Sequence, residues 1–165
     1  MYNQTTMTSD TIELVERVRQ RLSDHDDSCA IAGPAGEPAI IAAELALGVT
    51  FPPSYRTFLR TFGGITIPKH LGIVHDFVGL ETQQRTLDGR AHHKLGTNLV
   101  VVGMGAGDQE WFCLDSSRPT PSGEYPVLLF DARDNALDQQ FYDDFGQMLT
   151  QVMGFVADSL DHPLD

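Results

Sequence analysis

Apolar residues near the start of the chain recur every three to four positions. From Leu14 to Leu22 they fall on one face of a helix predicted over residues 11–23, with charged side chains on most of the other face. Asp10 precedes this helix and is predicted to cap it, with Glu13 completing a capping box.

Two further helices are predicted before residue 65. One begins at Pro38, because proline is tolerated in the first turn, and ends at Gly48, where a left-handed residue closes a helix. The next follows Pro53 and ends at Gly63-Gly64. Its apolar stripe consists of Tyr55, Phe58, Leu59 and Phe62.

The middle of the chain changes to short runs of β-branched and aromatic residues, which are typical of strands. The predicted strands are 64–67, 72–78, 99–102, 110–115 and 126–130. Short links favour antiparallel pairing. The polar segment 81–94 is compatible with a helix or with a long loop.

A helical apolar stripe returns at the end of the chain. It predicts a helix from about Asp138 or Asp143 to Leu160, and its members are Phe141, Phe145, Met148, Leu149, Val152, Phe155 and Val156. The order of elements predicts an α+β fold, in which a largely antiparallel sheet packs against N-terminal helices and a C-terminal helix. We expect one domain over residues 1–165, ordered over about 10–157, with an acidic tail at 158–165 that frays.

The net charge of the chain limits the kinds of molecule that it is expected to bind. The 165 residues carry a formal net charge of −12, divided as −5 over residues 1–50, +3 over 51–100 and −10 over 101–165. This excess argues against direct binding of nucleic acid or anionic lipid and favours a basic protein surface. The alternative is that the acidic residues only aid solubility.

The sequence contains no recognisable secretory signal or membrane-spanning segment. Residues 1–10 have no basic and apolar regions of a secretory signal, and no apolar run approaches the roughly 18 residues that span a bilayer. The cysteines, Cys29 and Cys113, are isolated in sequence, which fits a reducing compartment. We therefore expect a cytoplasmic protein.

Candidate catalytic and metal-binding motifs are weak. The glycine-rich segment 103–108 leads into a predicted strand, whereas a phosphate loop needs a helix N-terminus there. The six histidines lack zinc-site spacings, and no nucleophile elbow is present. We expect no catalytic residues, no metal and no cofactor.

An interaction surface is the remaining hypothesis. Acidic residues flank two predicted strands near their ends, and the only tryptophan lies beside them. The predicted partner-binding residues are Asp108, Glu110, Trp111, Asp131, Asp134 and Asp138. The alternative for Trp111 is that it fills the core.

Residues 38–64 carry the most specific pattern in the chain. A helix with a central glutamate is followed by an apolar-proline pair, a tyrosine, a Phe-Leu pair and two glycines. The matching residues are Glu44, Phe51, Pro52, Tyr55, Phe58, Leu59, Gly63 and Gly64. This pattern resembles the signature of the SUKH superfamily, named after yeast cell-wall-assembly regulators of the Smi/Knr type. The resemblance continues more loosely over about residues 10–155.

The resemblance implies a fold and two alternative roles. Bacterial members are immunity proteins that bind and occlude a toxin domain, often a nuclease, whereas fungal relatives act as non-catalytic regulatory scaffolds. The signature residues themselves have architectural roles. An acidic inhibitor suits a basic nuclease surface, so we expect an immunity protein whose partner is a cognate, basic toxin domain.

Overall fold

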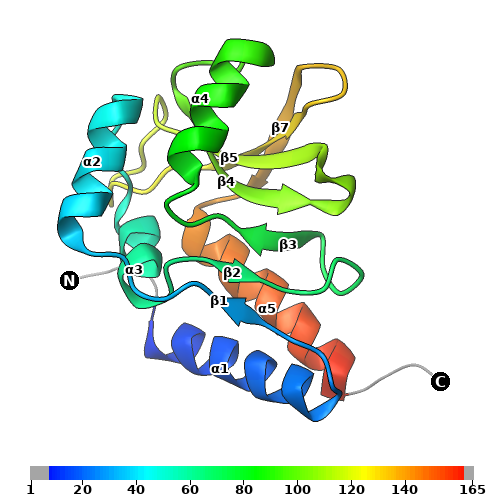
Figure 1. Ribbon diagram of the computed structural model, residues 1–165. Helices are drawn as coiled ribbons and strands as arrows, with labels where there is room; N and C mark the ends of the chain where they lie inside the picture. Colours follow the sequence, from blue (N-terminus) through cyan, green and yellow to red (C-terminus); the bar gives the residue numbers. More distant parts are fainter. Residues whose placement is uncertain (1–7, 162–165) are drawn as a thin grey trace.

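A seven-stranded antiparallel sheet forms the centre of the protein (Figure 1). The computed structural model describes residues 8–161. Each strand pairs with the strands before and after it in the chain, so the spatial order follows the sequence order. The strands are β1 (Ala30–Ile31), β2 (Ile65–Thr66), β3 (Val74–Phe77), β4 (Leu99–Gly105), β5 (Glu110–Asp115), β6 (Val127–Asp131) and β7 (Ala136–Tyr142).

Helices pack on both faces of this sheet. They are α1 (Ser9–Asp24), α2 (Glu37–Leu47), α3 (Pro53–Thr61), α4 (Thr82–His92) and α5 (Phe145–Asp161). In Figure 1, α5 runs behind the sheet beside α1, and α4 lies on the other side. No helix among the described residues is both long and apolar enough to cross a membrane. The arrangement confirms the predicted α+β fold with a largely antiparallel sheet.

The main core lies between the sheet and helices α1, α3 and α5. The ring of Phe145 packs 4.9 Å from those of Tyr55 and Phe58, measured between centroids, and all three side chains are buried. A smaller apolar cluster on the α4 side contains Val101, Cys113 and their neighbours. Burial on both sides explains why the central strands are continuous apolar runs.

The first helix begins earlier than predicted. Its N-cap is Thr8, whose hydroxyl accepts a hydrogen bond from the Thr11 amide at 3.3 Å. The prediction that Asp10 caps the helix is wrong: Asp10 lies in the first turn, where its negative charge faces the positive end of the helix dipole.

The ambiguous segment 81–94 contains helix α4. Two threonines hold it against β4: the Thr82 hydroxyl donates to the Val101 carbonyl at 2.6 Å, and the Val101 amide donates to the Thr86 hydroxyl at 3.0 Å. Because buried threonines and Gly89 make this contact, the segment lacks the apolar stripe by which a helix is predicted.

Strands β1 and β7 were not predicted, and β7 corrects the start of the last helix. Asp138 and Phe141 lie on β7, whereas α5 begins at Phe145. The Asp144 carboxylate accepts from the Gln147 amide at 2.8 Å, and this contact sets the helix start. As an edge strand with six exposed residues, β7 has no alternation of buried and exposed positions to predict it.

Helix α5 extends into the segment expected to fray. Its last turns include Asp158 and end at Asp161. The Asp161 carboxylate lies 2.8 Å from Arg21 Nε, which ties this end to α1. Residues 162–165 of the expected tail lie outside the described residues.

Gly63 permits a close approach between the chain after α3 and the segment before α2. Its φ is 73°, and a Cβ there would overlap the Gly33 carbonyl oxygen. The Gly33 amide also donates to the Phe62 carbonyl at 2.8 Å, so the two segments cannot separate without losing this bond. Only glycine satisfies both the left-handed φ and the available space.

We expect Gly63→Ala to lower the free energy of unfolding by about 3 kcal/mol or more, because it combines a steric overlap with backbone strain. The matched control is Gly154→Ala in α5, where a Cβ meets nothing within 4 Å. That change should leave stability equal or raise it by up to about 1 kcal/mol. Urea unfolding measures both variants, and equal effects would contradict the prediction.

Candidate functional site

Most of the predicted acidic residues gather at one end of β5 and β6. Glu110, the first residue of β5, pairs in register with Asp131, the last residue of β6. Asp134 lies in the following hairpin, and Asp108 ends a 3₁₀ turn directly before β5. Asp138 lies farther along the exposed strand β7. The structure therefore brings four of the five carboxylates to one end of the sheet.

Two of these carboxylates are already paired with basic side chains. Asp131 lies 2.9 Å from Arg133, and hydrogen bonds from Arg133 lower the pKa of Asp131. Asp108 lies 3.2 Å from Lys69, whose hydrogen bond lowers the pKa of Asp108. His75 Nε2 also lies 3.0 Å from Asp108. Both carboxylates are thus ionised at neutral pH, but their charge is offset locally.

The remaining acidic residues have no direct basic partner among the described residues, although the charges of Glu110 and Asp134 help to raise the pKa of Arg133. Within residues 8–161, neither a salt bridge nor a side-chain hydrogen bond to a basic group engages Glu110, Asp134 or Asp138. Asp134 and Asp138 are exposed, and Glu110 is half-buried. A basic partner would meet these three side chains without first breaking an ion pair.

Trp111 points to the opposite face of the sheet from Glu110, because consecutive strand residues alternate. Its ring stacks on Phe130 at 5.5 Å and meets His93 edge-on at 4.9 Å. The indole Nε1 donates to the Asp108 carbonyl at 3.2 Å. The half-buried Trp111 therefore packs under α4, and a flat partner surface over Glu110 would not reach its ring.

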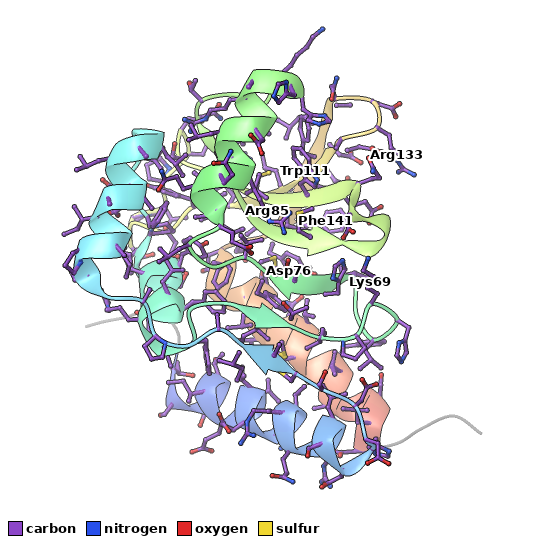
Figure 2. All side chains as sticks on the ribbon, viewed as in Figure 1. Lys69, Asp76, Arg85, Trp111, Arg133 and Phe141 are labelled. Carbon is purple, nitrogen blue, oxygen red and sulfur yellow. The ribbon has the colours of Figure 1, made fainter. Side chains whose placement is uncertain are left out.

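A groove beside Trp111 was not predicted from the sequence. It encloses about 470 Å³ between α4 and the sheet. Its lining residues are Arg85, Asp88, His92, His93, Val101, Met104 and Trp111. Figure 2 shows Arg85 near Trp111 and Asp76. No sequence signal identified this groove, because α4 itself was ambiguous.

The Asp76–Arg85 contact near this groove is loose. Arg85 Nη2 lies 3.7 Å from the Asp76 carboxylate, and Arg85 Nε is buried without a hydrogen-bond partner in the described part of the chain. Burial raises the pKa of Asp76, and Arg85 opposes this only in part.

The residues of the 38–64 pattern make specific contacts inside the fold. A Glu44 carboxylate oxygen accepts from the Phe51 amide at 2.7 Å and so fixes the turn between α2 and α3. The Tyr55 hydroxyl donates to the Val78 carbonyl at 2.6 Å and joins α3 to the chain after β3. Pro52 is the N-cap residue of α3.

The sequence of the chain matches the model of a known protein family. The model described as the SMI1 / KNR4 family (SUKH-1) matches residues 34–151, which is more than half of the chain. The chain belongs to the SMI1/KNR4 (SUKH-1) family. No individual curated protein matches it significantly.

In this SUKH-1 domain the signature residues are mostly interior. Phe51, Tyr55, Phe58 and Leu59 are buried, and Glu44 is half-buried. The signature therefore specifies how the helices join the sheet. Most of the exposed surface therefore consists of residues that the signature does not contain.

A buried carboxylate supports the same region of the SUKH-1 fold and was missed from the sequence. Glu124 accepts from the Ser54 amide at 2.9 Å and from the Ser54 hydroxyl at 2.6 Å, and both residues are buried. It therefore caps the first turn of α3 from 70 residues away. Because Glu124 is so far from α3 in the sequence, no pattern near residue 54 predicts this capping contact.

The described part of the SUKH-1 domain contains neither a metal-binding cluster nor an activated thiol. No group of three or more His, Cys, Asp and Glu side chains within residues 8–161 is close enough to hold a metal ion. Burial raises the pKa of Cys29 to about 11 and also raises the pKa of Cys113. Both thiols are protonated at neutral pH, so neither is an activated nucleophile.

Glu124 gives a pH-dependent test of its capping role. Burial raises the pKa of the Glu124 carboxyl in the folded protein above the usual 4.5. The folded state therefore favours the protonated carboxyl. This contribution to the free energy of unfolding is fully present below pH 4.5 and is lost as the pH rises through the pKa of the folded state. We expect the difference in unfolding free energy between wild type and Glu124→Gln to decrease between about pH 4 and 8.

Urea unfolding at several pH values measures this difference. Glu13→Gln, at an exposed position on α1, is the matched replacement of a carboxylate by an amide. A difference between wild type and Glu124→Gln that grows with pH would contradict the assignment.

Proposed function

We propose that this SUKH-1 domain is an immunity protein of a bacterial polymorphic toxin system. It acts in the cytoplasm, binds a cognate toxin domain and occludes it, without catalysis of its own. A nuclease is the toxin class that fits best, because a surface built to bind phosphates is basic.

The observation that carries the proposal is the distribution of unpaired carboxylates. Residues 134–161 contain six aspartates and no lysine or arginine, and they form β7 and α5 with their connections. Asp161 is paired with Arg21 of α1, and in the described part of the chain the other five make no salt bridge. Glu110 adds a further carboxylate at the neighbouring strand end. An excess of negative charge on these elements accelerates encounter with a basic partner and discriminates against acidic ones.

The alternative is a regulatory scaffold for an endogenous protein. Leu45 and Ile41 on α2 favour it, because they lie one helical turn apart with 78% and 44% of their surface exposed. A scaffold would use such an apolar face without a requirement for a basic partner. Gene neighbourhood separates the two roles, since an adjacent toxin gene favours immunity.

The proposal predicts protection in a co-expression experiment. A cell that expresses the toxin domain encoded beside this gene should survive when the SUKH-1 protein is co-expressed, and the two proteins should co-purify. An inactive toxin variant, expressed alone, controls for the burden of expression. Toxicity that persists despite soluble, co-expressed SUKH-1 protein would overturn the immunity role.

Charge reversal tests the surface. We expect Glu110→Lys combined with Asp138→Lys to slow association with the toxin domain about tenfold or more and to reduce its dependence on salt. The control combines Glu13→Lys with Asp24→Lys on α1, which changes the net charge equally at exposed positions. Stopped-flow or surface-based kinetics measure both. Equal effects of the two variants would show that only the total charge matters.

A further inference from the structure

An apolar groove lies on the α5 side of the sheet. It encloses about 210 Å³ and is lined by residues of α5, the end of β7 and the loop before β3. Phe155 and Ile73 stand at its rim with 63% and 52% of their surface exposed. These are two of the most exposed large apolar side chains among residues 8–161.

Phe141 extends this apolar surface along β7. It is 39% exposed, and its ring centroid lies 6.1 Å from that of Tyr142, which lines the groove. It also packs 5.7 Å from Phe112, a core residue on the same side. We call Ile73, Phe141 and Phe155 the groove trio.

The backbone beside the groove packs closely against helix α5. Gly72, next to Ile73, lies so close to α5 that a Cβ would be 3.3 Å from Val152 Cγ1. Tyr142, on another side of the groove, is buried. The exposed apolar side chains therefore project from backbone positions that are packed against the core, and a partner would have to order little of this backbone.

Glu110 borders the same surface. A Cβ on Gly105 would lie 3.0 Å from the Glu110 Cβ and 3.1 Å from the Ile73 carbonyl oxygen, so these two residues are near neighbours. The elements that carry Phe141 and Phe155 have only acidic charges. Lys69 and Arg133, which flank the strand ends in Figure 2, are already ion-paired.

We infer that the groove trio is the anchor site for the toxin domain. A protruding apolar side chain of the toxin inserts at Phe155 and Ile73, while lysines or arginines around it meet Glu110 and the aspartates of β7 and α5. This inference rests on the proposed immunity function and names the part of the surface that performs it. Trp111 and the α4 groove, on the other face, lie outside this contact.

The surrounding charge favours a basic partner over a second copy of the chain. Two copies joined through this face would bring Asp138 and Asp158 of each copy near one another, and neither makes a salt bridge within residues 8–161, whereas Asp161 is already paired with Arg21. A basic protein removes the same apolar surface from water and gains complementary charge. The few buried apolar anchors of such an interface carry most of its binding energy.

The test compares single substitutions in binding to the purified toxin domain encoded beside this gene. Phe155→Gln and Ile73→Thr should each raise Kd about 30-fold, mainly through faster dissociation. The matched control is Leu45→Gln on α2, which replaces a more exposed apolar residue and should change Kd less than about twofold. Unchanged unfolding midpoints verify that the variants remain folded.

The outcomes separate this inference from the proposed function. If wild-type protein neither binds nor neutralises the toxin domain, the immunity role fails and the anchor site with it. If wild type binds but both groove variants bind equally well, or Leu45→Gln weakens binding as much, the anchor assignment alone is wrong. A wild-type dimer in sedimentation that Phe155→Gln dissociates would also overturn it, with a second copy as the occupant.

Discussion

The buried side chain of Tyr55 connects the two halves of the fold. Its ring packs against Phe51 and Phe145, and its hydroxyl donates to the Val78 carbonyl. Burial raises the pKa of this hydroxyl, so it is always a donor in the physiological range. One side chain thus joins α3, α5 and the chain after β3. A buried hydroxyl that lost its acceptor would be strongly destabilising.

The helices around this point divide the sheet into two unlike faces. On one face, α5 leaves an apolar groove beside an acidic strand edge. On the other, α4 covers Trp111 and places Arg85, Asp88 and two histidines around a separate groove. Because Glu110 and Trp111 alternate on β5, no single flat partner can contact both side chains. The Glu110 and Trp111 side chains therefore lie on opposite faces of the sheet, while the Asp108 carbonyl accepts from the Trp111 indole at this strand end.

This division also separates the family signature from the exposed surfaces. The SUKH-1 signature lies in buried contacts between α2, α3 and the sheet, such as the bond from the Phe51 amide to Glu44. The acidic and apolar surfaces lie on β7, α5 and the strand ends, where substitutions cost little stability. We infer that the buried signature specifies the scaffold, whereas surface residues such as Ile73, Glu110 and Phe155 specify what the scaffold binds.

The sequence by itself determined the parts of this protein that depend on local patterns. The stripe from Tyr55 to Phe62, the helix-ending Gly48 and the apolar strands such as Glu110–Asp115 all agree with the structure, because their periodicity and capping are local. Tertiary structure decided the rest: β7 is a strand only because β6 supplies its hydrogen bonds, and α4 is held by threonines on Val101. Tertiary packing likewise decided which carboxylates are paired and that Ile73 and Phe155, 82 positions apart, share one groove. Such contacts depend on distances in space, which periodicity along a chain does not encode.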